Sequence, residues 1–385
     1  MHWSPEDIEM LRQTARRFVK ERLQPIEAEI DRADEISPDL DAQIRSEAVA
    51  LGLYGFNFPQ TLGGPGLPTE AKAAIYEEIT KTSMPLVEAI GHLPLTLAYC
   101  SEPQKQTLLP EIVAGTKLIT YALTEASAGS DLAAIQTRGK RVDGGWVLNG
   151  SKQFISNAET ADYLTVLTCT DPEANLKGKL TTFLVRRDNP GLKGMTRYRK
   201  MGWRGYQLNG FVLENCFVPD EDVLGSVGQG FEVMMSCINT DRVFSGFRAL
   251  GIAQRAHEMA VDYARQRSTF GSTLASHQAI QFMLADSDVE LQAARLLTRE
   301  ALRLTDMGHR DARIAASRAK LFATEMGCRV VDRAMQVFGG MGYMTELPIE
   351  RFYRDVRAFR IGEGTSEMQR IQIARHVLSD SADRG

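Results

Sequence analysis

Residues 360–367 read Arg-Ile-Gly-Glu-Gly-Thr-Ser-Glu, which places one carboxylate between two glycines. Glycine has no side chain, so backbone flanked by glycines can approach a ligand closely. The capping-box spacing of Ser366 and Gln369, followed by an apolar series over 368–377, predicts that a helix begins here. A lone acid at such a turn suits the removal of a proton from carbon. Glu363 is therefore a candidate base, although the octapeptide alone also suits a solvent-facing turn.

Four other segments carry polar residues and glycines next to apolar runs: 121–131, 149–157, 265–271 and 336–343. The first is a small-residue loop whose hydroxyls and amides suit a flat polar ring or a phosphate. The second places an aromatic and a hydroxyl two residues apart in a strand, and hence on one face. The third and fourth read as glycine-rich helix ends, of which the third also suits an anion. Each segment alone is equally well explained as a turn.

Several classes of site and of protein are disfavoured by the sequence. There is no G-x-G-x-x-G after a strand, no P-loop and no G-x-S-x-G, and the six histidines form no pair at zinc spacing, so we expect no metal. A net charge of −4 gives no sign of nucleic-acid binding, and no apolar run reaches the length of a membrane span. Five scattered cysteines and the lack of a signal peptide favour a reducing compartment, so we expect a cytoplasmic protein.

Three regions along the 385 residues would position these segments. Residues 1–120 are helical in pattern, and Ser4-Pro5-Glu6-Asp7 has the residue types of a helix start. Residues 121–228 hold short β-branched runs between turns, which predicts a small antiparallel sheet or barrel with strands near 145–150, 163–167, 180–185 and 207–219. Residues 229–385 predict a helical bundle with long helices near 252–265, 278–306 and 313–338.

Taken together and in this order, six motifs resemble the acyl-CoA dehydrogenase family of flavoproteins over essentially the whole chain. They are Ala-Leu-Thr-Glu-x-x-Ala-Gly-Ser-Asp, Leu-Asn-Gly-x-Lys, Lys-Met-Gly-Trp-Arg, Arg-x-x-Phe-Gly, Gln-x-x-Gly-Gly-x-Gly and Glu-Gly-Thr-Ser-Glu. The resemblance implies an α+β multidomain fold: an N-terminal α-helical domain, a middle antiparallel β-barrel-like domain and a C-terminal four-helix bundle, assembled as a homotetramer. It also implies FAD-dependent introduction of an α,β double bond into an acyl-CoA, with electrons passing to an electron-transfer flavoprotein.

The resemblance also assigns roles to individual residues. Glu363 corresponds to the base that removes the α-proton, and its own N–H to a donor for the thioester carbonyl. Substrate contacts fall on Ser130, Asp241, Arg242, Gly362 and Gly364. FAD contacts fall on Tyr121, Leu123, Thr124, Gly129, Ser130, Phe154, Ile155, Ser156, Arg267, Thr269, Phe270, Gln278, Gln336, Val337, Gly339, Gly340, Thr365, Ser366 and Glu367. Of these, residues 336–340 would reach the FAD of a neighbouring subunit.

Some residues depart from the family pattern. Gly362 stands where a tyrosine is usual, which predicts a wider pocket for a branched, cyclic or aromatic acyl group. Asp241 stands where some members place their catalytic glutamate, so it is a second acid, an acyl ligand, a partner of Arg242 or an alternative base. Phe154, Ser156 and Ala126 replace the usual tryptophan, threonine and proline.

Two residues of the N-terminal region bear on the acyl group. Glu88 and His92 either close the acyl pocket or are exposed on a helix. No arginine lies between Thr82 and Cys100, which argues against a dicarboxylic acyl group.

Other functions remain open at this point. The same chemistry on an acyl or aminoacyl thioester of a carrier protein is a close rival, because CoA and carrier share the pantetheine arm. An oxygen-using oxidase is a further alternative. A DNA-binding stress-response relative would carry a basic extension, whereas this chain ends Leu-Ser-Asp-Ser-Ala-Asp-Arg-Gly.

Overall fold

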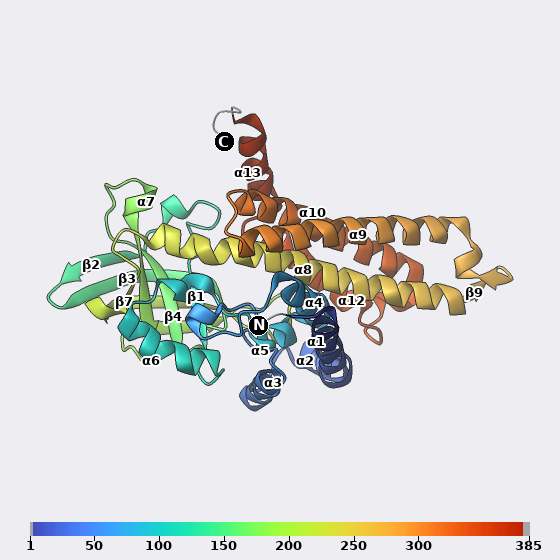
Figure 1. Cartoon of the computed structure of the whole chain (residues 1–385), viewed down its shortest axis with the longest axis horizontal. Coiled ribbons are helices and arrows are strands. Elements are labelled where there is room, and N and C mark those ends of the chain that lie inside the picture. The colour runs from blue at the N-terminus through green and yellow to red at the C-terminus, as the bar shows by residue number, and fades with distance from the viewer. Residues whose placement is uncertain (1–2, 380–385) are drawn as a thin grey trace.

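A computed structural model describes residues 3–379 of the chain, so residues 1–2 and 380–385 of the predicted terminal domains lie outside the described part. Figure 1 shows the N-terminal helices below a set of long helices, with a β-sheet region at one end of the molecule. The predicted order of helices, sheet and helices is confirmed. The boundaries at 120/121 and 228/229 stay predictions.

The N-terminal region is a set of short helices. Ser4 caps the first of them, accepting from the N–H of Asp7 at 3.1 Å, with Pro5 in the first turn, as the sequence predicts. The helices are α1 (Pro5–Arg17), α2 (Glu27–Ala33), α3 (Pro38–Ala50), α4 (Thr69–Ile79), α5 (Met84–Ile90) and α6 (Glu102–Val113), with a π-helical segment at Phe18–Leu23 and 3-10 turns at Gln24–Ile26, Gln60–Leu62 and Leu95–Tyr99.

The middle region is one sheet of eight strands in the order β6-β7-β3-β2-β4-β5-β8, with β1 paired to β4. The strands are β1 (Ile119–Ala122), β2 (Arg138–Val142), β3 (Gly145–Ser156), β4 (Tyr163–Cys169), β5 (Leu180–Arg186), β6 (Leu192–Arg197), β7 (Leu208–Pro219) and β8 (Val223–Leu224); the short helix α7 (Leu176–Lys179) precedes β5, and 3-10 turns lie at Leu132–Ala134 and Asp220–Asp222.

The expectation of a purely antiparallel sheet is wrong, because β1 and β2 both pair with β4 in parallel. Parallel strands require a long connection, and between β1 and β4 the chain forms β2 and β3. Alternation of apolar residues predicts strands but does not state their direction, so the sequence pattern could not distinguish the two arrangements.

The C-terminal region is the predicted helical bundle. Helices α8 (Gly230–Gln266), α9 (Gln278–Asp306), α10 (Ala312–Phe338) and α12 (Ile349–Phe359) form it, and α13 (Ser366–Leu378) packs on α10. A small hairpin of β9 (Ser268–Thr269) and β10 (Ser272–Thr273), followed by a 3-10 turn (Leu274–Ser276), joins α8 to α9, and the short α11 (Gly340–Tyr343) follows α10. Helix α8 begins at Gly230, well before the predicted start at Ile252. The prediction missed its first part because polar residues over 239–248 interrupt the apolar period of the helix.

The N-terminal region is fastened to the bundle through a buried carboxylate. Glu27 is 1% exposed and receives Arg255 from α8 and Arg351 from α12, each at 2.8 Å. A buried carboxylate needs such partners, because its desolvation is costly otherwise. These pairs join α2 to both α8 and α12.

Candidate active site

Glu363 lies in the turn between α12 and α13. Its φ is +56°, a conformation that non-glycine residues seldom adopt, and Gly364 follows at φ +87°. Two donors hold the Gly364 carbonyl: Lys320 Nζ at 2.7 Å and Gln369 Nε2 at 2.8 Å. The turn is therefore held from α10 and α13 in a strained conformation of the kind that persists at functional sites.

The predicted capping box at the start of α13 is wrong. Thr365, one residue earlier than predicted, is the cap, and its Oγ1 accepts from the N–H of Met368 at 3.3 Å. Ser366 is the first helical residue and is buried, and the amide of Gln369 turns to the Gly364 carbonyl. The N–H of Ser366 donates to the Arg360 carbonyl at 3.0 Å, so both residues support the turn of Glu363 rather than the cap.

The Glu363 side chain faces a cavity of about 140 Å³. All three regions of the chain contribute to its walls, since α5, β1, the end of β3 and α8 meet here. Its polar lining residues include Arg45, Glu88, His92, Thr120, Tyr121, Ser156, Asn157, Tyr206, Asp241, Arg248 and Glu363. A small cavity with this many ionisable groups has the features of a site for chemistry.

One oxygen of the Glu363 carboxylate is held and the other has no partner. Arg248 Nη1 donates to Oε1 at 3.1 Å, whereas Oε2 is buried and makes no hydrogen bond within the described residues. Burial raises the pKa of Glu363 to about 7; nearby Arg248 acts against this rise and Asp241 adds to it. A carboxylate with a pKa near neutrality can accept a proton in one step and release it in another.

Arg248 contacts Glu363 and is a site residue that sequence reasoning missed. Its buried guanidinium lies 3.8 Å from the centre of the Phe244 ring and forms an ion pair with Glu88. The signal was present, because Arg248 is the one charged residue in the apolar stretch 243–253 and follows Asp241 by two helical turns, hence on the same face. The inference drawn from the lack of arginine over 82–100 is therefore weakened, because α8 supplies one to the cavity.

Asp241 is buried beside Glu363, and three side chains approach it. The Tyr121 hydroxyl donates to Oδ2 at 2.7 Å, the Cys237 thiol lies at 3.3 Å, and His92 Nδ1 lies 3.7 Å from Oδ1. Burial raises the pKa of Asp241. These contacts leave Asp241 facing the cavity as a second acid.

Asp241 is not a partner of Arg242, which was one of the expected alternatives. Adjacent residues of a helix point in different directions. Arg242 instead donates to the Glu363 carbonyl at 3.4 Å and to Asn239 Oδ1 at 3.1 Å. Arg242 therefore supports the turn of the candidate base.

Glu88 and His92 are not exposed helix residues. Both line the cavity, and the His92 side chain is only 5% exposed. Its ring stacks on Phe244 with a centroid distance of 4.2 Å, and burial lowers the pKa of His92. The imidazole is therefore neutral at pH 7.

The loop that follows β1 is fastened by a buried lysine of β3. Lys152 Nζ donates to the Leu123 carbonyl at 3.0 Å and to Glu125 Oε1 at 2.7 Å, and burial lowers the pKa of Lys152 to about 8. The backbone N–H of Gln153 donates to the Thr124 carbonyl at 2.9 Å, and its side-chain amide donates to the Glu125 carbonyl at 3.2 Å. These bonds lie outside the regular sheet ladder, so they hold the loop beside β3 independently of strand pairing.

Phe154 follows at an irregularity of β3. The register against β7 shifts between Lys152 and Ile155, and Phe154 has a φ of +57° with its ring 51% exposed. Such a bulge re-aims a side chain. Ile155 is buried, whereas Ser156 lines the cavity, and Gly129 and Ser130 lie exposed in the adjoining loop.

The remaining predicted cofactor residues lie at the far end of the bundle, where Figure 1 places β9 opposite the sheet. They are Arg267, Thr269, Phe270, Gln278, Gln336, Val337, Gly339 and Gly340. The ends of α8 and α10 meet there, because the rings of Tyr263 and Phe338 lie 4.5 Å apart. Helix α8 separates Asp241, which contacts Tyr121 of the first group, from Gln266, the neighbour of Arg267 in the second group, by about 37 Å. Within one chain, therefore, a single FAD does not reach both groups.

The residues of both groups nevertheless fit FAD. The exposed Phe154 ring and the neighbouring loop offer a flat aromatic surface with hydroxyls and amides, as the isoalloxazine requires. At the other end, Phe270 is 95% exposed beside an exposed Arg267, and nothing lies within 4 Å of a Cβ built on Gly339 or Gly340. An exposed aromatic, a guanidinium and open glycine backbone suit an adenine and a diphosphate.

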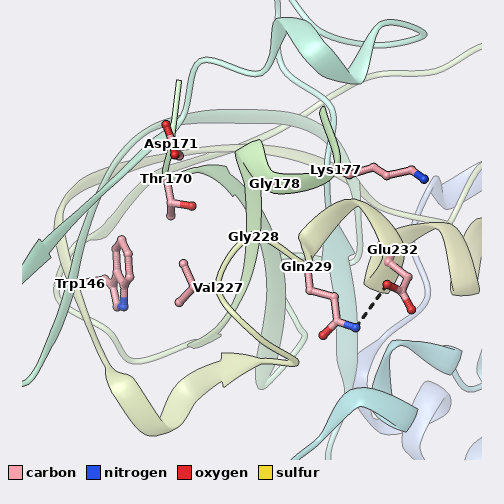
Figure 2. Close-up of a pocket in the computed structure, with 9 residues that line it drawn as sticks. All are labelled: Trp146, Thr170, Asp171, Lys177, Gly178, Val227, Gly228, Gln229 and Glu232. Atoms are coloured by element: carbon pink, nitrogen blue, oxygen red, sulfur yellow. Dashed lines mark hydrogen bonds between the residues drawn. The ribbon is translucent and has the colours of Figure 1, made fainter. Parts of the chain in front are cut away.

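A second, larger cavity of about 510 Å³ lies between the sheet and the start of α8, and Figure 2 shows its lining. Its side chains are dispersed, and the hydrogen bond from Gln229 to Glu232 at 3.3 Å is the interaction drawn among them. None of the predicted site residues lines it. The smaller cavity, which gathers the ionisable groups, is the candidate active site.

Two further properties concern metals and membranes. Across residues 3–379, no group of three or more His, Cys, Asp or Glu side chains is arranged to hold a metal ion. Over the same residues, no helix combines the length and the apolar character needed to cross a membrane.

Comparison with known proteins gives matches along almost the entire chain. The N-terminal, middle and C-terminal domain profiles of acyl-CoA dehydrogenases match residues 5–116, 120–216 and 228–378. The short-chain specific acyl-CoA dehydrogenase, mitochondrial, of Homo sapiens is 39% identical over 379 residues, covering 97% of this chain and 90% of the relative.

Solved structures agree. The butyryl-CoA dehydrogenase of Megasphaera elsdenii has a TM-score of 0.90 at 32% identity, covering 98% of this chain and 100% of its own. A chain solved in a study of the electron transferring flavoprotein of Acidaminococcus fermentans also has a TM-score of 0.90 at 32% identity, covering 99% and 100%. The chain therefore belongs to the acyl-CoA dehydrogenase family, and it is a flavin-dependent oxidoreductase that binds FAD.

Proposed function

We propose that Glu363 is the base that removes the α-proton of an acyl-CoA thioester. The observation that carries this role is the buried Glu363 Oε2, which has no hydrogen-bond partner among residues 3–379, on a side chain that lines the small cavity. Asp241, the other candidate, already accepts a hydrogen bond of 2.7 Å from Tyr121. Of the two acids, Glu363 has the buried oxygen without a partner, whereas Tyr121 and Cys237 contact Oδ2 of Asp241 and His92 lies 3.7 Å from its Oδ1.

The residues of the chain supply three parts of the reaction. The Glu363 carboxylate accepts the proton, and its raised pKa suits this step near neutral pH. The N–H of Glu363 would donate to the thioester carbonyl and stabilise the charge that develops there. Arg242 and Lys320 hold the backbone of the turn, so that this N–H keeps its direction. FAD supplies the acceptor for the β-hydride.

Glu363→Gln tests the proposal. The variant should bind FAD and show its yellow absorbance, while anaerobic bleaching by an acyl-CoA substrate slows by about 10²–10⁴-fold. Glu346→Gln, at an exposed glutamate between α11 and α12 that does not line the cavity, is the control and should bleach at the normal rate. Normal bleaching by the Glu363→Gln enzyme would contradict the proposal.

We further propose that the acyl group is branched, cyclic or aromatic. Gly362 supports this, because a Cβ built there would meet only the Ala358 carbonyl, at 3.8 Å, so the position beside the base has no side chain and few neighbours. The cavity, of about 140 Å³, is also small, and burying its charged walls against a long straight alkyl chain would be costly. An anaerobic titration with an acyl-CoA panel tests the proposal, and a strong preference for short linear acyl groups would contradict it.

Two partners are proposed with this activity. Similarity to the chain from the Acidaminococcus fermentans study supports an electron-transfer flavoprotein as electron acceptor. A second copy of this chain would supply Arg267, Phe270 and the glycines near 339 to the FAD held at Tyr121 to Ser130, since one chain does not bring them together. An apolar row of Phe282, Val289 and Leu296, exposed on α9, supports such an assembly, and we propose a homotetramer.

A further inference from the structure

We propose that Arg248 is a positioning residue for the base: its guanidinium, placed between Glu88 and Glu363, fixes the orientation and the charge of the Glu363 carboxylate. The inference rests on the proposed role of Glu363. It concerns a residue that none of the six sequence motifs contains.

The position of Arg248 is restricted on several sides. One nitrogen of its fork, Nη2, pairs with Glu88 of α5, and the planar group lies 3.8 Å from the centre of the Phe244 ring. The guanidinium is rigid and planar, so these two contacts determine where its other nitrogen points. That nitrogen, Nη1, lies 3.1 Å from Glu363 Oε1.

Because of this contact, the two carboxylate oxygens of Glu363 have different roles. Arg248 holds Oε1, while Oε2 stays without a partner among the described residues and is the oxygen left for the substrate proton. A charge-assisted hydrogen bond of this kind restrains the rotation of a carboxylate. Without it, the side chain of Glu363 would be free to turn toward Lys320 or toward the acyl group.

Arg248 also offsets the effect of burial on the charge of the base. Burial and the neighbouring carboxylates favour protonated Glu363, whereas the guanidinium favours the ionised form. Glu88 repels Glu363 and also neutralises part of the charge of Arg248, so it acts in the opposite direction to Arg248. The titratable and charged groups that face Glu363 are Arg248, Asp241, Arg242 and Cys237 of α8, Glu88 of α5, Lys320 of α10, Tyr121 of β1 and Tyr206.

The geometry therefore predicts opposite changes for the two partners of the ion pair. In Arg248→Gln the pKa of Glu363 should rise by about one unit or more, so activity is lost near neutral pH and largely regained at alkaline pH. In Glu88→Gln the pKa should fall, because a repelling charge is removed and Arg248 acts on Glu363 alone. Arg248→Lys keeps the charge without the fork, and should restore the pKa more than the turnover number.

The test uses the FAD-loaded enzyme. The pH profile of kcat/KM is measured with the best acyl-CoA of the panel, and the carboxyl band of Glu363 is titrated by infrared difference spectroscopy against the Glu363→Gln enzyme. Arg255→Gln is the matched control, because Arg255 is also an arginine of α8, partly buried, but pairs with the buried Glu27, at 2.8 Å. It should lower stability and leave the pH profile unchanged.

Opposite shifts in Arg248→Gln and Glu88→Gln support the proposal. An unchanged profile and carboxyl band in Arg248→Gln overturn it, and so does loss of binding of one class of acyl group without a shift, which would make Arg248 a substrate contact. If Glu363→Gln stays active, the proposed base is wrong instead, so the two failures are distinguishable.

Discussion

At the scale of single residues, the two glycines that flank Glu363 have different roles. Gly364 has a φ of +87°, and a Cβ there would lie 2.8 Å from Gln369 Nε2, so this position requires glycine for the backbone. Gly362 has no positive φ and has open space around its Cα. The backbone of the turn therefore requires glycine at 364 but not at 362.

Alanine at each position separates these roles. Gly364→Ala should lower the free energy of unfolding by about 1 kcal/mol or more and slow the enzyme with every acyl-CoA, because the turn of the base is strained. Gly362→Ala should leave stability nearly unchanged and reduce kcat/KM more for bulky acyl groups than for small ones. Thermal unfolding and a two-substrate comparison measure both effects, and equal loss of stability in the two variants would contradict the distinction.

At the scale of elements, the loop that follows β1 depends on β3. The buried pair of Lys152 and Glu125, together with the Leu123 carbonyl, ties residues 123–125 to the strand. Removal of one partner of a buried ion pair leaves an uncompensated charge, which costs more than the loss of an exposed pair. The motif Leu-Asn-Gly-x-Lys is therefore a structural support of the site, and its lysine is remote from the chemistry.

Lys152→Met should destabilise the protein by about 3–5 kcal/mol and weaken the retention of FAD, since Glu125 remains buried without its cation. Lys193→Met is the control, because it breaks an equally short pair of 2.8 Å with Glu214 that is more than half exposed, and should cost about 0–1 kcal/mol. Chemical denaturation measures the loss of stability, and the ratio of flavin to protein absorbance after gel filtration measures the retention of FAD. Similar losses in the two variants would show that burial of the pair does not matter.

At the scale of the whole molecule, α9 presents an apolar row to solvent. Phe282, Val289 and Leu296 are 60%, 67% and 69% exposed, and their spacing of two turns puts them on one face. Exposed rows of large apolar side chains mark interaction surfaces. Together with the separation of the two FAD groups, this row supports a site completed by another copy of the chain.

The double variant Phe282→Glu, Leu296→Glu should therefore lower the oligomeric mass in analytical ultracentrifugation and release FAD at the same time, because both depend on the same assembly. Met10→Glu, at an exposed apolar residue of α1, is the control and should change neither. A double variant that becomes monomeric yet keeps its full FAD content would show that one chain holds the cofactor by itself.

The sequence by itself determined the family, the order of helices and strands, and the identity of Glu363 as the candidate base. These follow from local signals: Ser4 with its proline and acids starts α1, apolar and β-branched runs form β4 and β5, and short motifs stand in register along the chain. Such signals depend only on neighbours in sequence, so they are readable without coordinates.

Only the tertiary structure decided which charged groups surround Glu363 and how far apart the two groups of predicted cofactor residues lie. Residues 88, 241, 248 and 363 meet because α5, α8 and the α12–α13 turn cross, and no local pattern reports a contact between residues more than a hundred positions apart. The same holds for the parallel pairing of β1 and β2 with β4, and for the length of α8, which separates the two cofactor groups. Side-chain proximity across the fold, and therefore the pKa of Glu363, arises from packing that the sequence pattern does not state.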